Sequence, residues 1–140
     1  IYDISGGVSE RTAGLINNGN SNLTKNGNQM MADLNNGKST KYITVYPTGE
    51  TDGQTMAQAA QSNYDKNTKI YGDAIRETST LETSKSSWYS DCSDYVGINT
   101  PFFLHGGNYS AASIAGCFSF GRTSGIGDYY RGFRSVLVSQ

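Results

Sequence analysis

The last third of the chain is dense in aromatic, glycine and small polar residues and lacks five other residue types. Residues 89–138 contain no Lys, Glu, Gln, Met or Trp, whereas residues 1–88 contain 18 residues of these types. Glycine and small polar residues separate short apolar runs throughout this segment, which predicts short strands joined by long loops. Loops on a rigid scaffold often carry function, so we expect the functional residues here.

Three strands are predicted within this segment. Residues 101–104 (PFFL) are fully apolar and precede two glycines, whereas residues 115–120 alternate, with Phe118 and Phe120 on one face. Residues 132–138 (GFRSVLV) form the last predicted strand. We expect the second and third strands to form an antiparallel hairpin joined by residues 121–131. A connection of that length inside a compact domain is usually functional.

The first two thirds of the chain predict further short elements. The patterns favour a short strand followed by a turn over 1–7, with the turn at 5–7, and strands over 8–12 and 42–46. They favour helices over 28–34 and 54–64, and loops over 14–28 and 78–87. We expect Asn28 to cap the first helix, with Gly37 just past its end. No internal repeat or linker interrupts the sequence, so residues 1–140 are predicted to form a single domain.

The charge and the apolar runs of the chain argue against nucleic-acid-binding and membrane-spanning proteins. The 140 residues carry a formal net charge of -1 with no long basic run, so no nucleic-acid partner is expected. No apolar run approaches the roughly 18 residues that a membrane span needs. Because the sequence begins at Ile1 and not at Met, we expect a fragment or a processed product.

Two cysteines and one histidine carry the remaining candidate chemistry. Cys92 and Cys117 are either unpaired or joined in one disulfide, because two cysteines alone do not define a framework. His105 has no Ser or Cys partner arranged around it, so we expect it to be structural. The chain has one histidine and no CxxC spacing, so no metal site is expected. No cofactor is predicted.

Two stretches resemble the formylglycine-generating-enzyme superfamily, a variant of the C-type lectin fold. Residues 1–10 (IYDISGGVSE) resemble its YDMSGNVWEW segment, with Ser9 in place of Trp. Residues 106–109 (GGNY) and 132–134 (GFR) resemble its RGGSW and GFR ending, with His105 in place of Arg. The resemblance covers residues 1–10 and about the last 50 residues. It implies an α+β domain with an antiparallel sheet, one or two short helices and long loops.

The catalytic residues of that superfamily do not carry over. Its enzymes use two cysteines five apart after the two glycines, and only Cys117 follows them here. The related iron-dependent sulfur transferases need several histidines, and this chain has only His105. The resemblance therefore implies the fold without the catalysis.

A second resemblance is to the branch of this fold that serves as variable target proteins of diversity-generating retroelements. These elements mutate template adenines, commonly in AAC or AAT codons. Randomising the first two bases of such a codon gives fifteen amino acids and excludes Lys, Glu, Gln, Met and Trp. That is the set missing from residues 89–138. An ancestral bias toward small and aromatic residues is the alternative explanation.

This resemblance implies that the last third of the chain divides into framework and display residues. The framework residues are expected in the core: Gly106, Gly107, Phe118, Phe120, Gly132, Phe133, Val136 and Leu137, with Arg134 bound to a carbonyl or carboxylate. The display residues are expected at outward or loop positions, in the manner of an antibody paratope: Asn108, Ser110, Ala111, Ile114, Cys117, Ser119, Arg122, Thr123, Ile126, Asp128, Tyr129 and Tyr130.

The function expected from these observations is non-catalytic ligand or receptor binding. The resemblance implies an adhesin on a phage virion or bacterial surface, with a protein or glycan partner on a cell surface and with oligomerisation left open. Two alternatives remain: an oxidase or sulfur transferase of the parent superfamily, and a fixed structural component of a virion or pilus.

Overall fold

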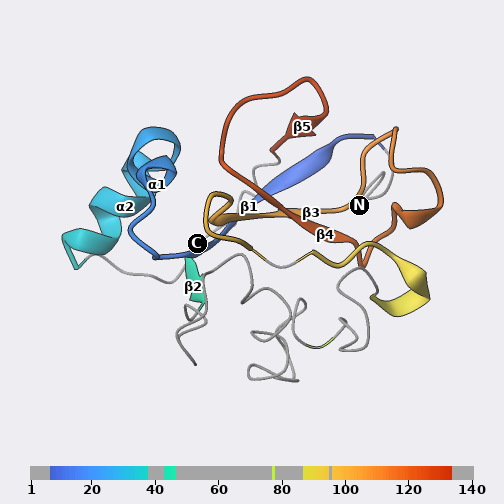
Figure 1. Cartoon of the computed structure of the whole chain (residues 1–140), viewed down its shortest axis with the longest axis horizontal. Helices are drawn as coiled ribbons and strands as arrows, with labels where there is room; N and C mark the ends of the chain where they lie inside the picture. Colours follow the sequence, from blue (N-terminus) through green and yellow to red (C-terminus); the bar gives the residue numbers. More distant parts are fainter. Residues whose placement is uncertain (1–6, 38–42, 47–76, 78–86, 95, 134–140) are drawn as a thin grey trace, which may run out of the picture.

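The protein has an α+β architecture, with an open mixed sheet of five strands and two short helices (Figure 1). The computed structural model describes residues 7–37, 43–46, 77, 87–94 and 96–133. In Figure 1 the two helices lie at one end of the sheet, and the loop that follows β3 lies at the other.

The sheet has the strand order β2-β1-β3-β4, and β5 pairs with β1. The bounds are β1 Ser9–Ile16, β2 Thr44–Tyr46, β3 Phe102–His105, β4 Phe120–Thr123 and β5 Arg131–Gly132. β3 runs antiparallel to β1 and β4, whereas β2 and β5 run parallel to β1, so the expectation of an antiparallel sheet is wrong. Glu10 pairs with both His105 and Gly132, which places β5 on the edge of β1 opposite β3.

The pairing of β1 with β3 is interrupted between Arg11 and Leu15. At this irregularity the Thr12 hydroxyl donates to the Phe103 carbonyl at 3.3 Å and accepts from the Gly14 N–H at 3.3 Å. One side chain thus satisfies main-chain groups that a regular ladder would pair. Such irregularities bend a strand and change the direction of its side chains, and they often lie beside functional sites.

Two helices pack against the start of β3. They are α1 Ser21–Asn26 and α2 Asn28–Asn35. Asn20 caps α1, since its side chain accepts from the Asn22 N–H at 2.8 Å. Gly27 joins the helices beside the Phe102 ring, and a Cβ at Gly27 would lie 2.7 Å from that ring. The close approach therefore requires glycine at this position.

The buried apolar side chains form two adjoining groups. The first contains Leu15, Leu23, Met31 and Phe102, and it joins β1 and β3 to the helices. The second centres on Phe103, whose ring lies 4.9 Å from Tyr46 and 6.3 Å from Phe120 between ring centroids. The central strands thus carry both groups, which is why β1 and β3 organise the fold.

Several predicted elements are confirmed, and one predicted loop is wrong. β1 confirms the strand over 8–12 and extends it, β2 and β3 confirm the strands over 42–46 and 101–104 within their described residues, and α2 confirms the helix over 28–34. The loop over 14–28 is wrong, because it contains the end of β1 and α1. Its asparagines act as local caps. The N-cap of α2 is Gly27 and not Asn28.

The predicted hairpin of the last third is also wrong in its described part. Residues 115–119 form a turn region, and the strand starts only at Phe120. β4 pairs with β3, whereas β5 pairs with β1, because the chain between them crosses to the other edge of β1. The predicted elements over 1–7, 54–64 and 78–87, and the end of the strand over 132–138, lie wholly or largely outside the described residues. None of the described helices is long and apolar enough to cross a membrane.

Candidate functional site

A cavity of about 260 Å³ lies between the β3–β4 pair, the loop after β3 and the start of β5. Six of the twelve display residues line it: Asn108, Ala111, Ile114, Ser119, Arg122 and Tyr130. These positions span 23 residues of sequence from Asn108 to Tyr130. The fold therefore brings half of the display residues to one concave site.

The other display residues do not line this cavity. Ser110, Cys117, Ile126 and Tyr129 are exposed, and Asp128 is half-buried. Thr123 lies in β4 and is only 2 % exposed, so its expected outward or loop position is wrong. Ser119 lies in a loop as expected, but it is only 3 % exposed. The Thr123 hydroxyl is instead occupied, since it accepts from the Gly125 N–H at 3.1 Å and from Arg131 Nη1 at 2.9 Å.

Some of the expected framework residues are buried, and others are not. Gly106, Gly107 and Phe120 are buried as expected, and Gly132 is half-buried. Phe118 is half-buried against the rings of Trp88 and Tyr89, at 5.3 and 5.6 Å between centroids. Phe133 is 82 % exposed, so its expected core position is wrong: β5 ends at Gly132 and leaves this ring outside the sheet. Arg134, Val136 and Leu137 lie outside the described residues.

The loop from 106 to 119 is held through its main chain. The Asp91 carboxylate accepts from the Phe118 N–H at 2.9 Å, and the Cys92 N–H donates to the Ile114 carbonyl at 2.9 Å. His105 Nε2 lies 3.0 Å from the Cys117 carbonyl, and it is the donor because a carbonyl can only accept. The exposed side chains of Ile114 and Cys117 take no part in these bonds.

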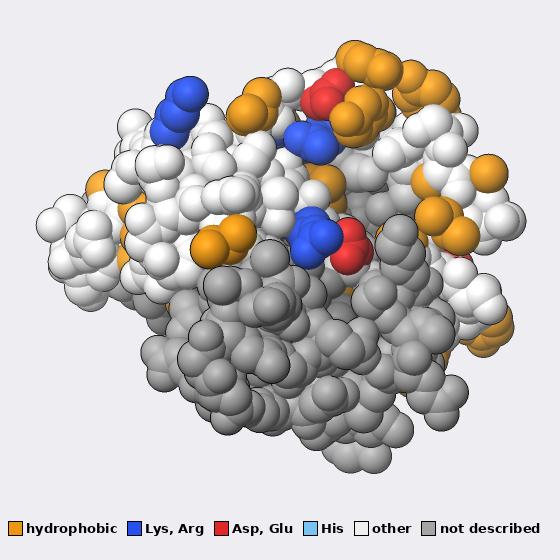
Figure 2. All heavy atoms as spheres, viewed as in Figure 1, with side chains coloured by type: hydrophobic (Ala, Val, Ile, Leu, Met, Phe, Trp, Pro, Cys, Tyr) orange, Lys and Arg blue, Asp and Glu red, His pale blue; other side chains and the backbone are white. Residues whose placement is uncertain are grey.

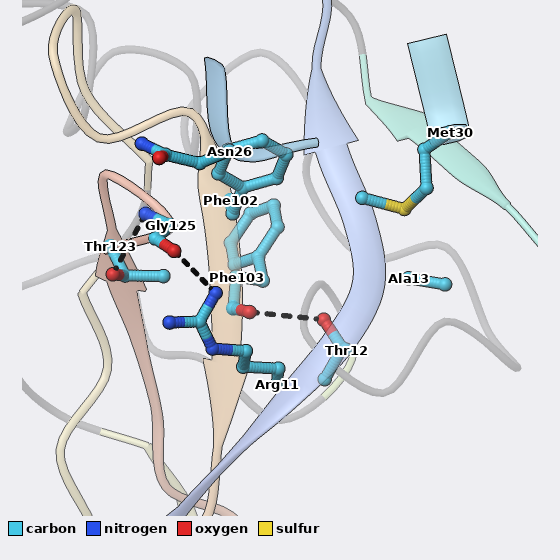
Figure 3. Close-up of a pocket in the computed structure, with 9 residues that line it drawn as sticks. All are labelled: Arg11, Thr12, Ala13, Asn26, Met30, Phe102, Phe103, Thr123 and Gly125. Carbon is cyan, nitrogen blue, oxygen red and sulfur yellow. Dashed lines mark hydrogen bonds between the residues drawn. The ribbon is translucent and has the colours of Figure 1, made fainter. Parts of the chain in front are cut away.

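The loop from 124 to 128 is held in the same way by side chains from outside the last third. Arg11 donates to the carbonyls of Gly125 and Ile126 at 2.5 and 2.6 Å, and Asn26 Nδ2 donates to the Ser124 carbonyl at 2.8 Å. Figure 3 shows Arg11 reaching from β1 to Gly125, beside a second cavity of about 300 Å³. This second cavity contains a single display residue, Thr123.

Sequence reasoning missed Arg11, Asn26 and Asp91 as supports of the site. Arg11 and Asn26 lie more than 90 residues before the carbonyls that they bind. Asp91 lies 27 residues before Phe118. A carbonyl presents the same acceptor in every residue type, so no side-chain pattern marks these partners.

Replacing Arg11 with alanine is expected to lower the free energy of unfolding by about 1–2 kcal/mol, because two carbonyls lose their charged donor. Amide hydrogen exchange should accelerate over residues 124–128 before it does elsewhere. Lys25→Ala is the matched control, since it removes an exposed cation from α1. Equal protection of the 124–128 amides in both variants would contradict this role of Arg11.

Four charged side chains set the electrostatics around the first cavity. Arg122 Nε forms an ion pair with Asp94 at 3.3 Å. The Arg131 guanidinium lies 5.2 Å from the centre of the Tyr130 ring, within cation–π range. A hydrogen bond to the Asp128 carboxylate, the largest cause, raises the pKa of the Tyr130 phenol. The phenol therefore remains protonated at neutral pH.

The site combines guanidinium, amide, hydroxyl and aromatic groups, which suit non-covalent recognition. Cys92 and Cys117 are not joined in a disulfide. Within the described part of the chain, no three His, Cys, Asp or Glu side chains come together to hold a metal ion. No protein-family model, no curated protein and no solved structure matches this chain.

Proposed function

We propose that the protein is a non-catalytic binding domain that displays interchangeable side chains on a fixed C-type lectin-like framework. It would act as the variable protein of a diversity-generating retroelement, on a phage virion or a bacterial surface. One observation carries the proposal: the loops that bear the exposed display residues are held through main-chain groups. Asp91, His105 and Arg11 provide those contacts.

Main-chain anchoring matters because it separates loop shape from side-chain identity. The carbonyls of Ile114, Cys117 and Ile126 remain acceptors whatever residue stands there. Exposed substitutions away from caps, strained backbone and buried networks usually change stability by less than about 0.5 kcal/mol. Such positions can therefore vary together without unfolding the domain.

The composition of the exposed surface suits a contact face. Large hydrophobic side chains are exposed throughout residues 88–133: Trp88, Tyr89, Ile98, Tyr109, Ile114, Ile126, Tyr129 and Phe133. Figure 2 shows hydrophobic side chains gathered along one edge of this view, beside basic and acidic side chains. Tyrosine gives rigid contact area with a hydrogen-bonding tip, as in antibody loops. A protein or glycan on a cell surface is the ligand that we infer.

A fivefold variant tests whether the face is interchangeable. Its substitutions are Ser110→Asn, Ile114→Thr, Cys117→Ser, Ile126→Asn and Tyr129→Ser, all at exposed positions. We expect cooperative urea unfolding with a total loss of no more than about 2 kcal/mol, because each change is small and the sites are largely independent. Loss of cooperative unfolding in this variant would contradict the division into framework and display residues.

Sequencing the same locus from several isolates tests the function itself. We expect substitutions concentrated at AAC or AAT codons in residues 89–138, and most frequent at the exposed display residues. The neighbouring DNA should carry a near-copy of this segment with adenines at those codons. Substitutions spread evenly over residues 1–140 would rule the proposal out.

A further inference from the structure

Arg131 brings to the first cavity a positive charge that forms no ion pair with any described residue. Its Nη1 is bound to the Thr123 hydroxyl at 2.9 Å and to the Ile126 carbonyl at 3.3 Å. Its Nη2 forms no hydrogen bond with the described residues, and no described carboxylate is close enough for an ion pair. Arg131 is therefore held in place by one nitrogen while another is left for a ligand.

The other charges near the cavity are already engaged. Arg122 and Asp94 compensate each other in their 3.3 Å ion pair. The Asp128 carboxylate accepts from the Tyr129 N–H at 2.8 Å, and its interaction with the Tyr130 phenol raises the pKa of that phenol. The cavity lining thus retains the charge of Arg131.

Asn108 adds a neutral donor to the same cavity. Its Oδ1 accepts from the Ser110 N–H at 2.9 Å and from the Ser110 hydroxyl at 2.6 Å. These two bonds orient the amide, so Nδ2 is the donor that remains. Nδ2 forms no hydrogen bond with the described part of the chain, and Asn108 lines the cavity.

We propose that this cavity binds a carboxylate group of the ligand between Arg131 and Asn108. The inference rests on the proposed function, because it takes the cavity as part of the ligand-facing surface, and it adds the chemistry of recognition. Guanidinium–carboxylate hydrogen bonds are among the strongest in proteins. A volume of about 260 Å³ suits one group of a larger ligand, either an acidic side chain or an acidic sugar.

A titration followed by NMR tests this on the ¹⁵N-labelled protein at constant ionic strength. The acidic probes are N-acetyl-aspartate N-methylamide and glucuronate, and the neutral probes are the asparagine analogue and glucose. We expect saturable shifts of the Asn108 side chain and the Gly121 amide with at least one acidic probe only. A response to the aspartate probe alone identifies a protein source, and one to glucuronate alone identifies a glycan source. No saturable response to either acidic probe would overturn the proposal.

Two variants locate the binding. Arg131→Gln is expected to weaken it about tenfold or more. Gly121→Val leaves the Arg131 bonds intact and fills the cavity, since a Cβ at Gly121 meets nothing within 4 Å. It should abolish binding with unchanged thermal unfolding. Lys25→Gln removes the same charge from α1 and should have no effect on binding.

Two results would place the carboxylate elsewhere and overturn the inference: undiminished binding in Gly121→Val, or equal weakening by Lys25→Gln and Arg131→Gln. Neither would affect the display proposal, because that proposal depends on the pattern of substitutions at the locus and not on the chemistry of one ligand.

Discussion

The Phe103→Ala variant is expected to lose about 3–5 kcal/mol of unfolding free energy, the usual cost of truncating a buried phenylalanine. Phe103 is fully buried on the central strand β3. Its ring contacts Tyr46 of β2 and Phe120 of β4, so the truncation removes packing against the strands at both ends of the order β2-β1-β3-β4. A loss of this size approaches the whole stability of many domains.

Urea unfolding followed by circular dichroism measures this loss, and Ile114→Ala is the control. Ile114 lies in the same third of the chain but is exposed, so its truncation should cost less than about 0.5 kcal/mol. The two variants compare a framework position with a display position. Similar losses would show that burial does not separate the two groups and would undermine the proposed function.

The sequence predicted secondary structure well where all residues of a run have the same polarity and are buried together. Residues 101–104 are uniformly apolar, and residues 102–104 form the buried part of β3. The alternation of Phe118 and Phe120 looked equally like a strand, yet Phe118 packs on Trp88 and Tyr89 in a turn region. Two aromatic residues separated by one position are compatible both with one face of a strand and with packing in an aromatic cluster, so the pattern alone does not distinguish the two.

The site was predictable only in part, because composition identifies an unusual segment but does not say which of its residues are buried. Composition indicated that the last third is unusual, and six of its display residues line one cavity. Composition does not report burial, so it could not show that Ser119 and Thr123, which were expected among the display residues, are buried. The supports from Arg11 and Asn26 were not predictable, because they bind carbonyls that every residue carries.

The second large effect is expected from Gly116→Ala, which should cost about 2–5 kcal/mol. A Cβ at Gly116 would overlap the carboxylate of Asp91, which is only 6 % exposed. Displacing that carboxylate leaves the Phe118 N–H without its acceptor and adds the strain of overpacking. Gly121→Ala is the matched control, since its new Cβ meets no atom within 4 Å.

A double-mutant cycle separates this mechanism from a general intolerance of alanine in the loop. If the cost of Gly116→Ala comes from the Asp91 carboxylate, the substitution should be much cheaper in an Asp91→Ala background, with a coupling energy of about 1–3 kcal/mol. An additive cycle would assign the cost to the backbone of Gly116 instead. Coupling would identify a glycine–carboxylate pair as the fixed support of the loop that carries Cys117. A loop supported in that way keeps its shape while Cys117 itself is exchanged, as a diversified face requires.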